Sequence, residues 1–150
     1  MTMICSQLIV WLDVNANDYV SSFRKKLTDN EHQCVKIFTE INPCITFIQT
    51  HVNQTIFFIL SGSFGSEVIP LIYHCDHISQ IYLFCASIAS HTSWAIDYTD
   101  KMLMFDHEND LLRRLFKDIE EYLRQQAEQY LKQASHCKDY AELFKQDQCG

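Results

Sequence analysis

The sequence predicts an α/β protein with a three-layer, doubly wound sheet of five parallel strands in the order 2-1-3-4-5, followed by a long C-terminal helix. Short apolar runs alternate five times with segments of helical period along the 150 residues. Only three glycines and two prolines occur, which favours regular elements joined by short turns. Right-handed crossovers leave few topologies, and five strands of this size favour the flavodoxin-like order.

The first strand is predicted at 8–12, LIVWL, and it ends at Asp13. A helix capped by Asn17-Asp18 is expected to follow, because Tyr19, Val20, Phe23 and Leu27 recur at helical spacing. The segment 34–38, CVKIF, alternates apolar and polar residues and indicates a half-exposed edge strand.

The third strand is predicted at 55–60, where TIFFIL is apolar throughout, as in a strand covered on both faces. Before it, Asn42-Pro43 indicates a helix start, with a cap and then proline at the first helical position. After it, a helix is expected to begin near Ser66. That start would place Pro70 close to the first turn, where a missing amide is tolerated.

The remaining elements are a strand at 81–85, a short helix at 90–98, a strand at 101–105 and a long helix from about Asn109. The long helix is expected to project beyond the sheet toward another module or another copy, and a second helical pattern is expected in 139–150. We therefore predict a domain at 6–125 and a helical extension or linker to a further module at 126–150. The apolar positions of the long helix are Leu112, Phe116, Ile119, Leu123, Ala127, Tyr130 and Ala134.

Composition limits the classes of partner. The net charge is −7 without any run of lysine or arginine, which disfavours nucleic acid and anionic membrane surfaces. No apolar run is long enough to span a membrane. The seven cysteines are odd in number and no signal peptide precedes them, so we expect reduced thiols in a cytoplasmic protein.

The candidate functional site lies where the strand order reverses, between the first and third strands. Loops at the carboxyl ends of neighbouring parallel strands meet at this edge of the sheet. We therefore expect one small ligand-binding crevice that takes residues from DVNAN, SGSFG and CAS. Its candidate residues are Asp13, Asn15, Ser61, Gly62, Ser63, Gly65 and Cys85.

The SGSFG segment contains both internal glycines of the chain, Gly62 and Gly65. The structural interpretation is a tight strand-to-helix turn, with a positive φ at one of the two glycines. The functional alternative is a phosphate site at the amides of Gly65, Ser66 and Glu67, where a helix would start. The Glu67 carboxylate would compete with a phosphate there.

Other chemistries find less support in the sequence. Ser61-x-Ser63-x-Gly65 resembles a hydrolase elbow, but the chain lacks an acid and a histidine after separate later strands. The segment 74–77, HCDH, is rich in ligand types, but no second ligand pair matches it. Cys85 ends an apolar strand and is expected to be an inert buried thiol. We expect no catalytic residue, no metal and no cofactor.

Over residues 6–125, this element order and an acid at the end of LIVWLD resemble the receiver domains of response regulators. The resemblance implies a flavodoxin-like fold. The family's phosphotransfer needs an aspartate after the third strand, a Thr or Ser after the fourth and a lysine after the fifth. Those places hold Ser61, Cys85 and Asp106, so the resemblance implies a pseudo-receiver without that chemistry.

Several motifs also resemble the amino-terminal module of a group of invertebrate multidomain proteins. They are VWLD at 10–13, SGSFG at 61–65 followed by Pro70 and Ile72, QIY at 80–82 and SWA at 93–95. In that group the module precedes an arginine-type ADP-ribosyltransferase domain or tetratricopeptide repeats. The resemblance implies a larger parent protein, and no R-S-E-x-E set of that transferase occurs in this chain.

The sequence thus predicts a non-catalytic regulatory or protein-interaction module. Its partner is expected to be another protein or a neighbouring domain, contacted through the C-terminal helix. A homodimer, in which the partner is a second copy of this chain, is one such case. Two alternatives stay open: the front part of an NAD-dependent arginine ADP-ribosyltransferase, or a small domain that binds a phosphate ligand at SGSFG.

Overall fold

The computed structural model describes residues 6–16, 22–29 and 34–148. Within them the predicted architecture is confirmed, because five parallel strands form one sheet in the order β2-β1-β3-β4-β5. The strands are β1 (Gln7–Leu12), β2 (Val35–Phe38), β3 (Thr55–Ser61), β4 (Ile78–Phe84) and β5 (Met102–Phe105). The α-helices are α1 (Ser22–Thr28), α2 (Ile41–Thr50), α3 (Gly62–Ile72), α4 (Thr92–Ala95) and α5 (Glu108–Gln148), and 3₁₀ turns flank α4.

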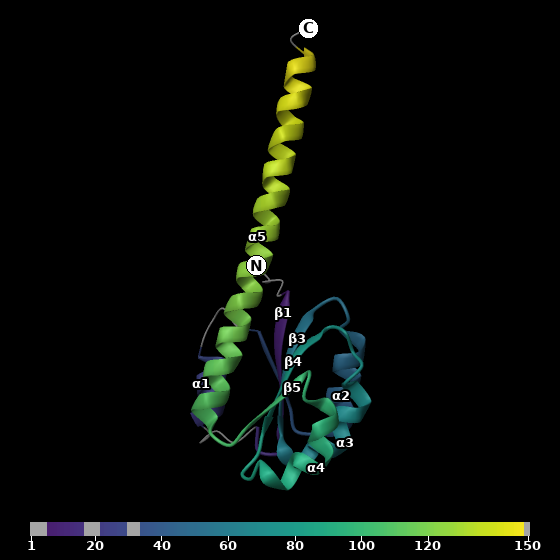
Figure 1. Cartoon of the computed structure of the whole chain (residues 1–150), viewed down its shortest axis with the longest axis vertical. Coiled ribbons are helices and arrows are strands. Elements are labelled where there is room, and N and C mark those ends of the chain that lie inside the picture. The colour runs from purple at the N-terminus through teal and green to yellow at the C-terminus, as the bar shows by residue number, and fades with distance from the viewer. Residues whose placement is uncertain (1–5, 17–21, 30–33, 149–150) are drawn as a thin grey trace. The chain divides into compact units, whose positions relative to one another are not determined.

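Helices cover both faces of the sheet. Figure 1 shows α1 on one face and α2, α3 and α4 on the other. The central strand β3 is covered on both sides, since none of the residues 56–60 is more than 1% exposed. The edge strand β2 has no fully buried residue. Both predictions made from the apolar patterns of these two strands are confirmed.

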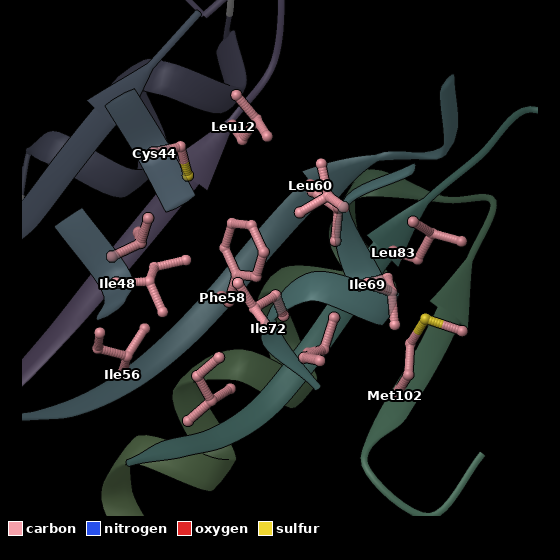
Figure 2. Close-up of a cluster of buried hydrophobic side chains, with 14 of the residues drawn as sticks. Leu12, Cys44, Ile48, Ile56, Phe58, Leu60, Ile69, Ile72, Leu83 and Met102 are labelled. Carbon is pink, nitrogen blue, oxygen red and sulfur yellow. The ribbon is translucent and has the colours of Figure 1, made fainter. Parts of the chain in front are cut away.

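The larger part of the core lies between the sheet and the α2–α3 face. Figure 2 shows Phe58 of β3 among side chains of α2 and α3, with Met102 of β5 also in this cluster. Val10 and Leu12 of β1 point to this cluster, so the alternate residues of β1, including Trp11, point to the face that α1 covers.

The start of α3 differs from the prediction. The helix begins at Gly62 rather than near Ser66, and Pro70 therefore lies inside it. Proline has no amide hydrogen, so the carbonyl of Ser66 loses its partner within the helix. Pro70 and Ser66 are both exposed, which leaves that carbonyl open to water. Likewise, α2 begins at Ile41, ahead of the predicted cap and proline.

Two further expectations concern helix ends. Asn17-Asp18, Tyr19 and Val20, expected to start the first helix, lie outside the described residues. At the other end of the chain, no second helix starts within 139–148, because α5 runs without a break to Gln148.

By its contacts the chain divides into two compact units, Met1–Arg113 and Arg114–Gly150. The boundary between these units falls within α5. Within the first unit, the Lys26 Nζ–Glu108 Oε1 ion pair of 3.2 Å joins α1 to the first turn of α5. The second unit is helical from Arg114 to Gln148.

Candidate functional site

Strand register brings the carboxyl ends of β1, β3 and β4 together at one edge of the sheet. Leu12 of β1 pairs with Leu60 of β3, and Ser61 pairs with Phe84 of β4. Asp13 follows Leu12 directly, so it emerges beside Ser61 at the carboxyl edge of the sheet. This edge is the switch point of the strand order, as the topology predicted.

A pocket of about 360 Å³ opens at this edge, and it lies within the first unit. It contains three of the predicted site residues, Asp13, Asn15 and Ser61. Its lining residues are Trp11, Asp13, Asn15, Ser22, Phe23, Ile59, Leu60, Ser61, Phe84 and Glu108.

The two carboxylates of the pocket already have local partners. Asp13 Oδ1 accepts a hydrogen bond of 2.9 Å from the Asn15 backbone amide, which closes the turn after β1. Glu108 Oε1 lies 3.2 Å from Lys26 Nζ and accepts a bond of 3.3 Å from the Ser22 hydroxyl. Both carboxylates therefore hold the walls of the pocket in place. Their charge also disfavours a phosphate in this pocket.

Aromatic side chains supply the apolar part of the lining. The rings of Trp11 and Phe23 lie 4.9 Å apart between centroids at a tilt of 59°. Trp11 is only 4% exposed, because α1 covers this face of β1. Sequence reasoning did not place Ser22, Phe23, Phe84 or Glu108 at the site. The helical period assigns Phe23 to the first helix. Only the packing of α1 against the sheet shows that Phe23 also contacts Trp11 and lines the pocket.

Gly62, Gly65 and Cys85 are not among the residues that line the pocket. Instead they form a close contact between α3, the end of β4 and the α4 region. A β-carbon added at Gly62 would lie 2.8 Å from Cys85 Cβ and 3.0 Å from His91 Nε2. One added at Gly65 would lie 2.5 Å from the ring of Trp94. Both glycines are therefore required by packing.

The prediction of a positive φ at Gly62 or Gly65 is wrong, because neither glycine has one. Both lie within α3 and keep its right-handed backbone. The glycines therefore make room for neighbouring elements rather than turn the chain.

The anion site predicted at Gly65, Ser66 and Glu67 is also wrong in its position. With α3 starting at Gly62, these amides lie beyond the free first turn and bond to carbonyls four residues back. Ser61 is the residue before the helix, and its side chain makes no capping bond to the backbone. Its hydroxyl lies 3.2 Å from that of Ser63 instead. Ser63 is exposed and does not line the pocket.

The buried cysteines are poor nucleophiles. Burial raises the pKa of the Cys85 thiol, and the nearby Asp106 carboxylate raises it further. Burial also raises the pKa of Cys44 to about 12. Since the thiolate is the reactive form, both thiols stay protonated and inert at neutral pH.

The His74–His77 segment lines a second pocket together with Gln49 and Val52. His77 Nε2 is hydrogen-bonded to the Ile48 carbonyl oxygen, so this ring has a structural partner. Among the residues that the structure describes, no group of three or more acidic, histidine or cysteine side chains could hold a metal ion.

The expectation of reduced thiols is wrong for Cys34, which is disulfide-bonded. The other cysteines in the described ranges, Cys44, Cys75, Cys85 and Cys137, are free. In the same ranges, no helix has the length and apolar content that crossing a membrane requires.

Comparisons of this chain with protein-family models, with curated proteins and with solved structures found no match.

Proposed function

We propose that this chain is a non-catalytic interaction module of pseudo-receiver type, whose contact surface is the exposed apolar side of α5. The observation that carries the proposal is the exposure of large apolar side chains along the second unit. Buried cores normally take up such residues, and a continuous exposed set marks an interaction surface. On one side of the helix they are Leu123, Tyr130, Leu131, Tyr140 and Phe144, each between 41% and 70% exposed.

The carboxyl edge of the sheet supports a non-catalytic role. Ser61 follows the hydrophobic stretch of β3 where a receiver needs its phosphoacceptor aspartate, and Cys85 and Asp106 follow β4 and β5. The carboxylates of Asp13 and Glu108 are engaged by neighbouring residues. A phosphate-ligand domain remains the second candidate, but these charges and the position of the α3 amides weaken it.

The experiment compares sedimentation velocity of the full chain at rising concentration with that of two variants. Tyr130→Glu puts a charge on the exposed apolar side, and Gln125→Glu makes the same change of charge at an exposed position away from it. We expect concentration-dependent association of the wild type and of Gln125→Glu, and its loss in Tyr130→Glu. If the sedimentation of all three proteins is equally independent of concentration, and phosphate compounds raise the Tm in a saturable way, the ligand-binding alternative would be favoured.

From the resemblance alone, we further propose that the module belongs to a longer protein with an arginine ADP-ribosyltransferase domain or tetratricopeptide repeats. Sequencing the transcript beyond Gly150 tests this. A cytoplasmic location is kept as a proposal, and the disulfide at Cys34 counts against it because cytosolic disulfides are rare. Cell fractionation with thiol labelling decides the compartment.

A further inference from the structure

The exposed side of α5 contains a regular seam. From Leu123 to Phe144, small and apolar residues follow one another at alternating intervals of four and three, and every one of them is exposed. An average interval of 3.5 residues is the repeat of helices that wind around another helix. The seam consists of Leu123, Ala127, Tyr130, Ala134, Cys137, Ala141 and Phe144.

The seam has two rows, each with a repeat of seven residues. One row is alanine throughout: Ala127, Ala134 and Ala141. The other row holds the larger side chains: Leu123, Tyr130, Cys137 and Phe144. A helix that packs on this seam therefore meets large and small positions in strict alternation.

This alternation sets the orientation of a second, identical helix. In a parallel pair each residue meets its own equivalent, so Tyr130 would face tyrosine and Ala134 would face alanine. Two helices at a constant distance of about 8–10 Å cannot fit both layers, since one is overfilled and the next is left with a cavity. In an antiparallel pair the row of larger side chains meets the alanine row of the other copy, so Leu123 and Tyr130 each pack against an alanine and no layer holds two aromatic rings. The Cys137 layer is smaller, and Phe144 lies at the end of the seam opposite Glu120.

We propose that the seam binds a second copy of this chain as an antiparallel two-helix coiled coil. Leu123 faces Ala141 of the second copy, Tyr130 faces Ala134, and Cys137 faces Ala127. This proposal deepens the proposed function and rests on it, because it names the partner of the same surface. In this pairing the row of larger side chains on each copy fits the alanine row of the other copy.

The flanking residues fit this pairing. Leu131, 70% exposed, lies beside the two-fold axis and meets Leu131 of the second copy. Arg124 and Lys138 come to lie on one side of the pair as like charges. Arg124 is ion-paired at 2.8 Å with Glu120 of its own helix. Lys138 has Glu142 four residues further along, a spacing at which opposite charges attract.

The exposed area is sufficient for a stable pair. Two leucines and three aromatic residues of the seam and its flanks are 41% to 70% exposed, which together leaves on the order of 500 Å² of apolar surface in water. The alanines and Cys137 bring each copy near the roughly 800 Å² per partner that standard interfaces bury. The seam spans roughly 33 Å of helix.

Mild oxidation of the full chain tests the orientation, because a disulfide needs β-carbons about 4 Å apart. All proteins carry Cys149→Ser so that residue 149 cannot take part in the linkage, and peptide mapping tells the bond apart from any that involves another cysteine. Ala127→Cys places a thiol opposite the native Cys137 of an antiparallel partner. The matched control Ala141→Cys changes the same row at a position that faces Leu123 in the antiparallel pair and faces itself in a parallel one.

We expect Ala127→Cys to give a linked dimer of twice the 17.6 kDa chain mass, with the bond between residues 127 and 137 identified by peptide mapping. Little linkage is expected in Ala141→Cys or in the protein with Cys149→Ser alone, where Cys137 meets alanine. Linkage through residue 141 or between two native Cys137 thiols would show a parallel pair, which overturns the antiparallel proposal and leaves the interaction module standing. If no protein forms a linked dimer and all of them keep the mass of a single chain at every concentration, the partner of the seam is not a second copy. The proposed function would then lose the self-association that supports it.

Discussion

At the scale of single residues, the two internal glycines show how a local signal can be misinterpreted. Glycine after a buried strand usually indicates a turn with positive φ, and that prediction was wrong for Gly62 and Gly65. Their function is to let α3 approach Cys85, His91 and Trp94. These partners lie far along the chain, so neither the glycine spacing nor the helix period could indicate them.

Gly65→Ala is expected to destabilise the protein by about 1–3 kcal/mol, the usual cost of overpacking. The added methyl group meets the rigid Trp94 ring at 2.5 Å. Helix propensity alone predicts the opposite sign, a gain of about 1 kcal/mol for glycine to alanine. Urea unfolding measures the difference, with Trp94→Leu as the partner in a double-mutant cycle. If Gly65→Ala costs as much in the Trp94→Leu background as beside the native tryptophan, the close contact is not the cause.

Cys44 is expected to make stability fall at alkaline pH. Burial raises the pKa of this thiol from 9.0 to about 12, so the folded state holds the proton more tightly than the unfolded state. The stabilisation is complete below pH 9 and is lost as the pH rises from 9 toward 12. The free energy of unfolding of wild type and Cys44→Ala, measured at several pH values, checks this. Parallel pH profiles of the two proteins would contradict it.

At the scale of elements, the strands were predictable because each has its own pattern. The apolar run of β3 and the alternating run of β2 indicate a central and an edge strand, and the sheet order follows from crossover rules. The same topology placed Asp13, Asn15 and Ser61 at one edge. It could not place Ser22, Phe23 and Glu108, because their positions depend on how α1 and the start of α5 pack on the sheet.

Substitution of Pro70 tests where α3 begins. Because Pro70 lies inside the helix and is exposed, Pro70→Ala restores an amide to the Ser66 carbonyl without a clash. We expect a gain of about 1–3 kcal/mol in the free energy of unfolding, measured by urea titration. The control is Ser66→Ala, which leaves that hydrogen bond absent and should change stability by less than about 0.5 kcal/mol. A loss of stability in Pro70→Ala would place the helix start nearer to Ser66.

At the scale of the whole molecule, the two units use their apolar residues differently. The first unit buries them in the sheet core, where Phe58, Leu60 and Ile69 are fully covered. The second unit leaves them in water along α5 between Leu123 and Phe144. Most of the stability of helices in proteins comes from packing of their apolar side, so we expect another helix to cover this side.

Hydrogen exchange of the full chain at low and high protein concentration tests this expectation most directly. We expect the amides of residues 123–144 to exchange fast in dilute protein and to become protected as the protein concentration rises. The amides of β1 and β3 should stay protected throughout. Exchange of 123–144 that is unchanged across the concentration range would contradict the claim that this side of α5 is the contact surface for a second copy.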